Sequence, residues 1–298
     1  MTAYLQYLLV KGFSFFINLL PEGVALWVGR QLGRGAYHLV RDRQKVALQN
    51  LRTAFGQEKS DEELRTIAVK VFQNLGMTAV EFFRIPAMGL ETFKKRVEIE
   101  GMEVIRRVLD NSTKGGFLLL SHLGNWELMA LAGRILNLSI SVVAKPIKKN
   151  PWMDRMVTEI RGKMGLQVIP AERASRKVMR ALSENRLVGI LIDQRAKRSE
   201  GVWADFFGRK APTTPALSVL AMRTGAPVIP VFMVRNGYQE HRLMFKEPLK
   251  LVNTGNIKRD IEANTQLMNQ TLELMIRQYP DQWFWVHRRW ERKKVSLS

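Results

Sequence analysis

Cysteine is absent from this chain of 298 residues. Its absence excludes disulfide bonds, a catalytic thiolate and zinc sites built on cysteine, and it is compatible with a reducing compartment. Histidine is nearly as scarce, with four residues at positions 38, 122, 241 and 287, and no two of them have the spacing of a metal site. We therefore expect neither a metal nor a bound cofactor.

Acidic residues are also few. The chain has 27 Asp and Glu against 47 Lys and Arg, which gives a net charge of +20 and a pI near 10.5. Such an excess predicts anionic partners: nucleic acid, acidic lipids, phosphorylated substrates or an acidic protein. The 46% hydrophobic content and seven tryptophans suffice for a substantial core and exclude disorder. The length allows one large α/β domain with appendages, or two smaller domains.

The N-terminal region is unusually apolar. Tyr4–Leu20 is almost wholly apolar, interrupted by Gln6, Lys11 and Asn18, and a second apolar stretch, Val24–Val40, has arginines at its polar positions. As a helix the first stretch spans roughly 26 Å, slightly short of a hydrocarbon core of about 30 Å. It therefore predicts either a marginal membrane span or a pair of interfacial helices, rather than plain core helices. We expect a membrane-anchoring segment over residues 1–42, followed by one domain over 43–298.

Beyond residue 60 the chain has clear helical and strand patterns. The segment from Ser60 begins with a capping box and predicts a helix to about Arg84. Strands and helices then alternate, which predicts an α/β fold with a mixed, mainly parallel sheet flanked by helices. The expected strands are 97–100, 116–120, 140–144, 168–169, 187–192, 228–234 and 241–245. The expected helices are 102–109, 125–136, 151–164, 175–183, 215–224 and 257–279.

The most informative segment is Phe117–Glu127, which reads FLLLSHLGNWE. It predicts a buried strand that ends at His122, a turn at Gly124, and a helix capped by Asn125 with Glu127 in its first turn. In one continuous helix His122 and Glu127 would lie about 140° apart, but at a strand end and a helix start they can meet. A histidine oriented by a carboxylate is a general-base arrangement. Because such a pair also arises by chance, the rest of the chain has to support it.

Two further charged residues are candidates for the same site. Asp193 follows the strand Leu187–Ile192, and polar residues beyond the carboxyl ends of parallel strands gather at one edge of the sheet. Arg161 lies near the end of the helix 151–164. If Arg161 and Asp193 meet, they form a partly buried ion pair, which is either functional or architectural.

Two segments combine basic and aromatic residues. Residues 195–214 predict a long loop in which Phe206 and Phe207 line an apolar channel while Arg209 and Lys210 meet phosphates. The C-terminal run Trp283–Lys294 resembles either a single-strand nucleic-acid tail or a membrane-interface belt, and the apolar N-terminus favours the belt.

The chain contains an ordered set of motifs: Gln49–Leu51 with Phe55, His122–Glu127 (HLGNWE), Asp193–Gln194, Phe207–Gly208, Gly225–Pro230 (GAPVIP) and Trp285–Trp290 (WVHRRW). Together they resemble the lipid A biosynthesis acyltransferases, the late lauroyl/myristoyl-type transferases of Gram-negative bacteria. The resemblance covers nearly the whole chain. In the wider lysophospholipid and glycerolipid acyltransferases the histidine motif usually ends in aspartate, and the glutamate at position 127 is typical of the lipid A branch.

The resemblance implies an inner-membrane enzyme whose active site faces the cytoplasm. It would move an acyl chain from acyl carrier protein to a hydroxyl of a 3-hydroxyacyl chain on a phosphorylated lipid A precursor. His122 would be the general base and Glu127 its orienting carboxylate. Backbone N–H groups near Gly124 and Asn125, or Arg161, would stabilise the oxyanion. The remaining expected site residues are Asn125, Arg161 and Asp193 as supporting groups, and Phe207, Arg209, Lys210, Arg288 and Arg289 as substrate-binding groups.

Two alternatives remain open from the sequence. One is an acyltransferase that acts on another lipid, such as a lysophospholipid or a glycosylated phosphoinositide. The other is a basic protein that binds membranes or nucleic acid without chemistry. The resemblance favours the lipid A enzyme, for which no nucleic-acid partner is expected.

Overall fold

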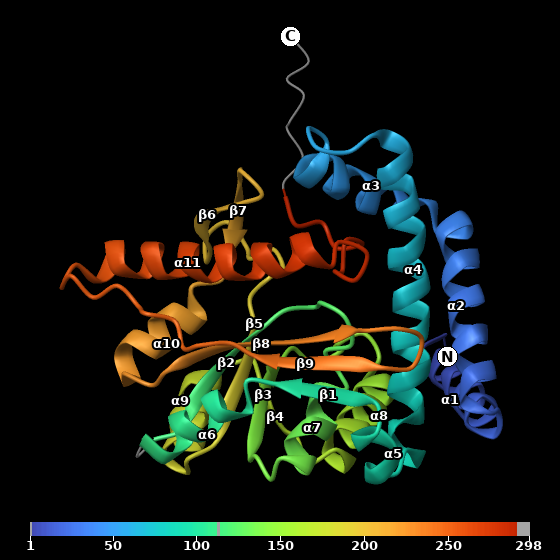
Figure 1. Ribbon diagram of the computed structural model, residues 1–298, viewed down its shortest axis with the longest axis horizontal. Coiled ribbons are helices and arrows are strands. Elements are labelled where there is room, and N and C mark those ends of the chain that lie inside the picture. Colours follow the sequence, from blue (N-terminus) through green and yellow to red (C-terminus); the bar gives the residue numbers. More distant parts are fainter. Residues whose placement is uncertain (1, 112–113, 291–298) are drawn as a thin grey trace.

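A seven-stranded sheet lies at the centre of the molecule, as the computed structural model in Figure 1 shows; the structure describes residues 2–111 and 114–290. Neighbouring strands are parallel except β8 and β9, so the expected mixed, mainly parallel sheet is confirmed. The strand order is β1-β9-β8-β2-β5-β3-β4. The strands are β1 (Val97–Glu100), β2 (Gly116–Leu120), β3 (Ile140–Ala144), β4 (Gln167–Pro170), β5 (Leu187–Leu191), β8 (Val228–Arg235) and β9 (His241–Phe245).

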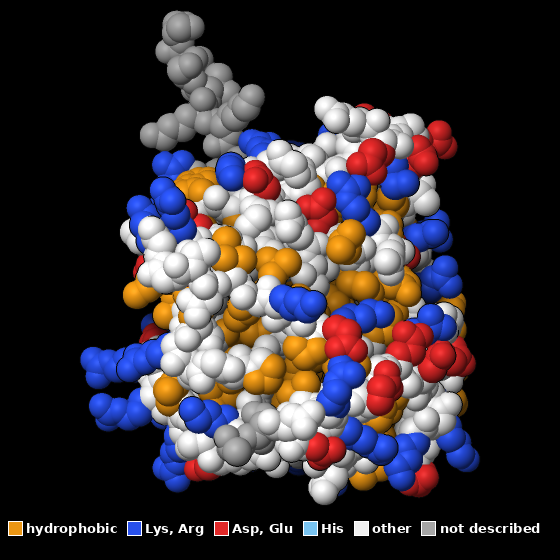
Figure 2. Space-filling view, turned by 60° about the vertical axis from the view of Figure 1, so that its left-hand side comes forward, with side chains coloured by type: hydrophobic (Ala, Val, Ile, Leu, Met, Phe, Trp, Pro, Cys, Tyr) orange, Lys and Arg blue, Asp and Glu red, His pale blue; other side chains and the backbone are white. Residues whose placement is uncertain are grey.

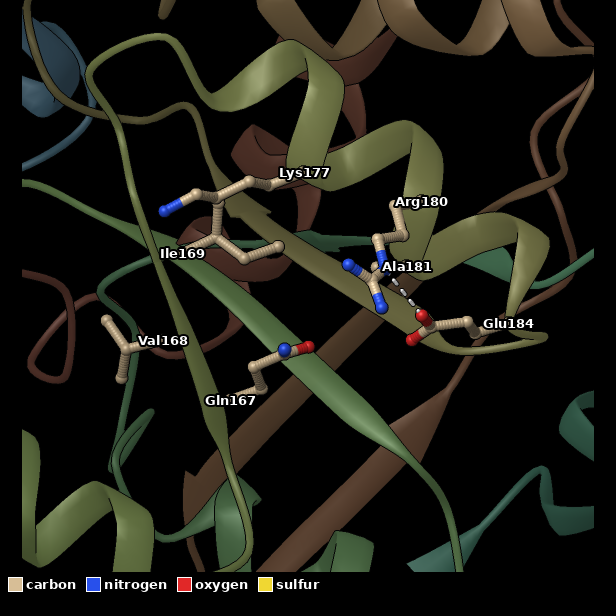
Figure 3. A pocket seen from close by; sticks show the side chains of 7 residues that line it. All are labelled: Gln167, Val168, Ile169, Lys177, Arg180, Ala181 and Glu184. Carbon is tan, nitrogen blue, oxygen red and sulfur yellow. Dashed lines mark hydrogen bonds and ion pairs between the residues drawn. The ribbon is translucent and has the colours of Figure 1, made fainter.

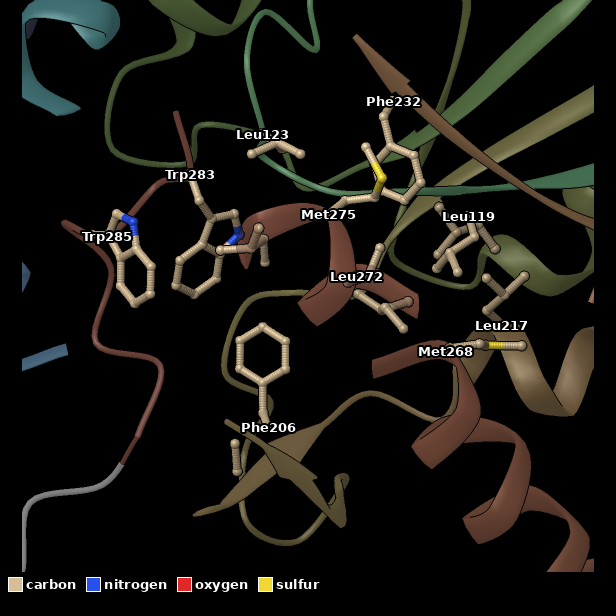
Figure 4. Close-up of a cluster of buried hydrophobic side chains, with 14 of the residues drawn as sticks. Leu119, Leu123, Phe206, Leu217, Phe232, Met268, Leu272, Met275, Trp283 and Trp285 are labelled. Atoms are coloured by element: carbon tan, nitrogen blue, oxygen red, sulfur yellow. The ribbon is translucent and has the colours of Figure 1, made fainter. Parts of the chain in front are cut away.

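Helices cover both faces of this sheet. Because side chains alternate along a strand, Phe117 and Leu119 of β2 enter one hydrophobic cluster while Leu118 and Leu120 enter the other. The first cluster includes α3 (Arg41–Phe55), α9 (Ala174–Ser183), α10 (Ala216–Thr224) and α11 (Ile257–Gln278), and Figure 4 shows part of it. The second includes α5 (Leu90–Lys94), α6 (Met102–Asn111), α7 (Met129–Ile135) and α8 (Pro151–Lys163).

The long helix α4 (Asp61–Arg84) stands at the edge of the sheet and joins the two clusters (Figure 1). Its capping box is formed, since Ser60 accepts a hydrogen bond from the Glu63 backbone and the Glu63 side chain accepts one from the Ser60 backbone. Its first half contributes to the cluster of α11, and Phe82 in its second half contributes to the cluster of α7 and α8.

The expected loop 195–214 contains a two-stranded hairpin instead. β6 (Val202–Phe206) pairs with β7 (Arg209–Thr213) in antiparallel register. Phe207 and Gly208 form the turn with φ of 53° and 66°, as a type I′ turn requires. The hairpin contacts α11, where the Phe207 backbone N–H donates to Glu273 at 2.6 Å. The prediction of an irregular loop was therefore wrong for this stretch.

The N-terminal helices pack against α4. α1 (Thr2–Leu19) and α2 (Glu22–Leu39) lie beside it in Figure 1, and α2 follows it closely. At the closest approach a Cβ on Gly33 would lie 2.1 Å from the Phe72 carbonyl oxygen, so only glycine fits there. Among the helices of residues 2–111 and 114–290, none is both long and apolar enough to cross a membrane.

The crossing of α2 and α4 gives a paired test of packing. We expect Gly33→Ala to destabilise the protein by about 1–3 kcal/mol, because its methyl group overlaps the α4 backbone. Gly35→Ala in the same helix meets no atom within 4 Å. This control should be neutral or stabilising by up to about 1 kcal/mol, as is usual for Gly→Ala in a helix. Thermal unfolding of both variants decides the matter, and equal melting temperatures would contradict the close crossing.

Candidate active site

The structure brings His122 and Asp193 together at the carboxyl ends of β2 and β5. These strands are parallel neighbours, with Leu120 opposite Leu191, so both residues emerge at the same edge of the sheet. The Nδ1 atom of His122 lies 2.8 Å from Oδ1 of Asp193, and the His122 backbone N–H donates to Oδ2 at 2.8 Å. The prediction that both residues follow strand ends and lie together is confirmed.

Asp193 is the partner of the imidazole, in the position expected for Glu127. Since an ionised carboxylate accepts hydrogen bonds, Nδ1 carries the proton and Nε2 presents a lone pair. The Gln194 amide nitrogen lies 3.3 Å from that Nε2 and can donate to it. The His122 side chain is 20% exposed, so the ring is open to solvent in part. This is the tautomer and orientation that a general base needs.

Burial and hydrogen bonding act in opposite directions on Asp193. Its side chain is 1% exposed, and burial alone raises the pKa of a carboxyl group. The charge and hydrogen bonds of His122, together with the Trp283 indole N–H at 2.8 Å, outweigh burial and lower the pKa of Asp193 below its usual value. Asp193 is therefore an anion that is held by three N–H groups.

Aromatic rings enclose the imidazole. The ring of Trp126 lies 5.1 Å from that of His122 in an edge-on arrangement, and the ring of Phe284 lies 5.7 Å away. The Phe284 backbone N–H also donates to the His122 carbonyl at 3.0 Å. The C-terminal segment thus completes the site, because it supplies both Phe284 and the Trp283 indole.

Glu127 pairs with Arg161 instead of His122. The Arg161 Nε and Nη2 atoms donate to the two Glu127 oxygens at 3.0 and 2.6 Å, and the pair is partly buried. Burial lowers the pKa of Arg161, but the bonds to Glu127 outweigh this effect and raise it overall. The expected contact between Glu127 and His122 was therefore wrong, and Arg161 meets Glu127, not Asp193. Each carboxylate takes the other's partner, because spacing along the chain does not show which one faces the ring.

The turn after His122 is held from behind. Gly124 has φ of 61°, and its N–H donates to the Gln282 carbonyl, while the Asn125 N–H donates to the Met233 carbonyl, both at 3.0 Å. These two N–H groups are engaged in the fold, which contradicts their expected role at an oxyanion. Asn125 caps the Leu128 N–H at 3.2 Å, and α7 itself begins only at Met129. Glu127 thus lies in the turn before the helix.

A buried carboxylate beneath this turn was missed. Glu81 of α4 accepts hydrogen bonds from the Asn125 side chain at 2.6 Å and from Arg235 of β8. The available signal was a single charge in the apolar run Val80–Phe83. A charge at such a position needs a buried partner. The sequence offered no comparable signal for the indole of Trp283.

The family model of the bacterial lipid A biosynthesis acyltransferases matches residues 1–292. The chain belongs to this family. The resemblance drawn from the motifs is thereby confirmed, and the motif HLGNWE is the turn that carries His122 and Glu127.

Individual relatives are distant but cover most of the chain. The lipid A biosynthesis palmitoleoyltransferase of Escherichia coli is 27% identical over 282 residues, which cover 94% of this chain and 89% of the relative. The lipid A biosynthesis lauroyltransferase of the same organism is 28% identical over 295 residues, with 96% and 91% covered. A phosphatidylinositol mannoside acyltransferase of Mycobacterium tuberculosis is 27% identical over 222 residues, with 70% and 66% covered.

Two of the expected substrate-binding residues lie in the core. Arg289 is fully buried, donates to the Pro212 carbonyl at 2.9 Å and to Thr213 at 2.7 Å, and lies over the Phe206 ring. Burial lowers the pKa of Arg289 to about 10. Phe207 is 5% exposed and packs on Phe55 and other aromatic rings. Both side chains are packed in the core and not open at the surface, and their role as substrate-binding groups stays a prediction.

The other three basic residues remain at the surface. Lys210 is exposed and pairs with Asp205 at 2.9 Å, and Arg288 is exposed. Arg209 is half-buried near Arg288, and both line a small cavity beside α3. The structure does not test their role as substrate-binding groups.

The C-terminal tryptophans are core residues and do not form an interface belt. Trp283, Trp285 and Trp290 are 2%, 0% and 6% exposed, since they pack with Phe206 and Phe207 on α11 and the sheet. Asn50 of α3 holds this segment by donating to the Trp285 and His287 carbonyls at 2.7 and 2.6 Å. The expected membrane belt at 283–290 was therefore wrong, and residues 291–294 of that run lie outside the described residues.

A separate cavity of about 330 Å³ opens between β4 and α9. Figure 3 shows its lining, which includes Lys177, and Arg180 paired with Glu184. β5 and β3 lie between β2 and β4 in the sheet, so this cavity is not part of the His122 site.

A second histidine near the site makes a prediction for acid stability. His287 accepts a hydrogen bond from the Arg195 backbone at 3.1 Å, and burial lowers the pKa of His287 to about 4. Because the unfolded chain binds this proton near pH 6.5, stability falls as the pH drops from about 6.5 to 4. His287→Gln removes that titration and should reduce the acid-induced loss by about 1–3 kcal/mol, after allowance for partial exposure.

Denaturant unfolding at pH 7.5, 6 and 5 measures this difference. The exposed His38 of α2 provides the control as His38→Gln, which should follow the acid sensitivity of the parent. An unchanged slope in His287→Gln would contradict the burial of a neutral imidazole at position 287.

Proposed function

We propose that this chain transfers a fatty acyl group from acyl carrier protein to a hydroxyl of a 3-hydroxyacyl chain on a lipid A precursor, with His122 as the general base. Membership of the lipid A acyltransferase family supports the reaction class. The observation that carries the proposal is the imidazole of His122, whose Nδ1 contacts a buried carboxylate while the ring stays partly exposed.

In the proposed reaction the acceptor hydroxyl gives its proton to His122 Nε2 as its oxygen attacks the thioester carbonyl. Asp193 keeps the proton on Nδ1 and stabilises the imidazolium that forms. The tetrahedral intermediate then collapses, the carbon–sulfur bond breaks, and the imidazolium returns the proton to the leaving thiolate. The products are the ester and the free carrier thiol. General-base assistance of this kind contributes roughly 10²–10⁴-fold.

Direct transfer is favoured over an acyl-enzyme. The chain has no cysteine, and Ser121, the hydroxyl nearest to the base in sequence, is 1% exposed. Successive side chains of an extended segment point to opposite sides, which directs Ser121 away from the face of His122.

Glu127 and Arg161 have a complementary task in this proposal. A bidentate bond to Glu127 fixes the plane of the Arg161 guanidinium, and Nη1 still has donors for a ligand. A guanidinium suits either the oxyanion or a lipid phosphate. Since Gly124 and Asn125 use their N–H groups within the fold, Arg161 is the better of the two expected oxyanion donors.

The charge of the chain suits both proposed substrates. Acyl carrier protein is acidic and a lipid A precursor carries phosphates, whereas this chain has a net charge of +20. Figure 2 shows Lys and Arg side chains along the edges of one face, with apolar side chains between them. Long-range attraction of this kind raises association rates and weakens with salt.

A second acceptor has support from one relative. The similarity to a phosphatidylinositol mannoside acyltransferase favours a glycosylated phosphoinositide as the alternative acceptor. Both acceptors are phosphorylated glycolipids, so the same base chemistry applies to each. Mass spectrometry of lipid A from cells with and without the gene separates them, since lipid A lacks a secondary acyl chain in the cells without the gene only if lipid A is the acceptor.

We further propose that the protein works at the cytoplasmic face of the inner membrane and is attached through α1 and α2. These helices expose an unusual number of large apolar side chains to solvent, which costs free energy unless lipid covers them. The side chains that are at least 43% exposed are Tyr4, Leu5, Leu8, Leu9, Phe15, Phe16, Leu19, Val24, Trp27, Leu32 and Leu39.

Substitutions at the base and its carboxylate test the catalytic proposal. His122→Ala and Asp193→Asn should each lower acyl transfer by about 10²–10⁴-fold. The first removes the base, and the second removes the negative charge and leaves an NH2 group facing either Nδ1 or the two N–H groups that Oδ2 now accepts from. Glu127→Gln should cost less, about tenfold, because one neutral bond to Arg161 remains. The assay is acyl transfer from the carrier protein to the purified lipid acceptor. Turnover at the parent rate in His122→Ala would refute the assigned base.

Surface substitutions test the attachment. Phe15 and Leu19 on α1 are 69% and 67% exposed, so Phe15→Glu with Leu19→Glu should leave the fold intact. Vesicle binding should fall at least about tenfold, since each large apolar side chain contributes about 1.5–3 kcal/mol when buried in lipid. Flotation of the protein with vesicles of anionic phospholipid measures this binding. The control is the double variant Ile257→Glu with Leu274→Glu on α11. These two residues are 70% and 64% exposed, and the variant should bind vesicles as the parent does.

A further inference from the structure

A buried network of charged groups lies behind the turn that carries His122, and the proposed reaction uses none of them directly. Its centre is Glu81, which is 2% exposed. One of its oxygens accepts from the side-chain amide of Asn125 at 2.6 Å and also from Arg235; the other accepts from Arg235 Nη1 at 2.9 Å. His241 of β9 lies 3.5 Å from that second oxygen. Three elements, α4, β8 and β9, thus meet the turn at one carboxylate.

The carboxylate stays ionised in this setting. Burial raises the pKa of Glu81, but the charge of Arg235 and the contacts with Arg235 and His241 outweigh burial and lower it to about 2. At neutral pH both oxygens therefore act purely as acceptors. A carboxylate can serve the Asn125 amide and the guanidinium of Arg235 together. A carboxamide of the same size cannot, because one of its two ends is a donor.

The side chain of Asn125 stabilises the turn by two hydrogen bonds, one as acceptor and one as donor. Its Oδ1 accepts from the Leu128 N–H at 3.2 Å, while its Nδ2 donates to Glu81. Asn125 is fully buried and lies between His122 and Glu127 in sequence. A bond that fixes Asn125 therefore fixes the chain on both sides of it, including the position of the base and of the carboxylate that binds Arg161.

We propose that Glu81 is a positioning residue for acyl transfer, which holds the turn 122–127 in its reactive geometry through the amide of Asn125. The inference rests on the proposed function, in which His122 is the base. Glu81 touches no substrate in this proposal. A displacement of reacting groups by about 1 Å is enough to cost on the order of 10²-fold in rate. The loss of Glu81 should therefore appear in kcat, with the KM values for donor and acceptor little changed.

A reciprocal exchange tests the bond between the two side chains. In Glu81→Gln one end of the new amide must face a donor, either Asn125 or Arg235, and kcat should fall by about 10²-fold. In Asn125→Asp two carboxylates face each other, and kcat should fall similarly. In the double variant Glu81→Gln/Asn125→Asp the amide of Gln donates to the new carboxylate. Its kcat should be at least about tenfold higher than the product of the two single losses predicts, since donor and acceptor are exchanged with the total charge kept, even though the Gln amide still faces Nη2 of Arg235.

The pH dependence of Asn125→Asp gives an independent readout. Arg235 and His241 are the other charged or titratable groups that face this pair. Two carboxylates in contact share a proton as the pH falls, which restores a hydrogen bond between them. The ratio of Asn125→Asp activity to parent activity should thus rise from pH 8 to pH 6, because effects of pH that are common to both enzymes cancel in the ratio.

A purely structural role predicts different results. Asp260 is 1% exposed and holds the loop before α11 through Thr254, so Asp260→Asn is a matched loss of a buried carboxylate. Thermal unfolding of every variant gives the folded fraction by which its rate is corrected. If Glu81→Gln loses no more kcat than Asp260→Asn, or if the double variant is as slow as the product of the two single losses, the positioning role is overturned.

The positioning role is also overturned if none of the Glu81 and Asn125 variants folds, because that outcome assigns Glu81 to stability alone. The proposed function is tested separately by His122→Ala. If His122→Ala retains full transfer while the exchange of Glu81 and Asn125 still rescues the rate, the base assignment fails and the positioning of the turn stands.

Discussion

The arrangement of the site depends on one buried carboxylate. Asp193 accepts hydrogen bonds from the ring of His122, from the backbone of His122 and from the indole of Trp283. These groups come from the end of one strand and from the C-terminal segment, so a single anion joins parts of the chain that are 71 and 90 residues from it in sequence. Without three donors a buried charge would be too costly to keep. The same bonds that stabilise the anion therefore fix the tautomer and direction of the imidazole.

The surrounding fold holds His122, Asp193 and Trp283 in the positions that these hydrogen bonds require. Parallel pairing of β2 and β5 brings His122 and Asp193 to one edge, and Asn50 of α3 holds the C-terminal segment that delivers Trp283. On the opposite side α4 presents Glu81 to the turn, and one helical turn later Arg84 donates to the Leu20 carbonyl at 3.0 Å. The helix that contacts the turn of His122 is thus also bonded to the segment between the exposed apolar helices α1 and α2.

Local patterns in the sequence predicted most elements, because burial and periodicity are properties of short segments. The capping box at Ser60 and the apolar run of β2 are examples. Partners were harder to predict, since several carboxylates can satisfy one imidazole and only tertiary packing selects Asp193 over Glu127. The hairpin at Phe207 was missed for a related reason. An aromatic residue at positive φ is rare, and here packing on Phe55 and Trp285 stabilises it.

The two carboxylates of the site differ in environment, and this difference suits different tasks. Asp193 is buried, contacts only N–H donors and holds a neutral ring that gains charge when it takes a proton. Glu127 is more exposed and binds Arg161. Because a guanidinium is always charged, Glu127 can change the position of Arg161 but not its charge. If His122 were paired with Glu127 and Arg161 with Asp193, the imidazole would contact the more exposed carboxylate. The guanidinium of Arg161 would then be buried beside Asp193. The observed pairing instead places the Nδ1 contact of His122 on a buried carboxylate and leaves the guanidinium of Arg161 partly exposed, as the proposed transfer to an anionic substrate requires.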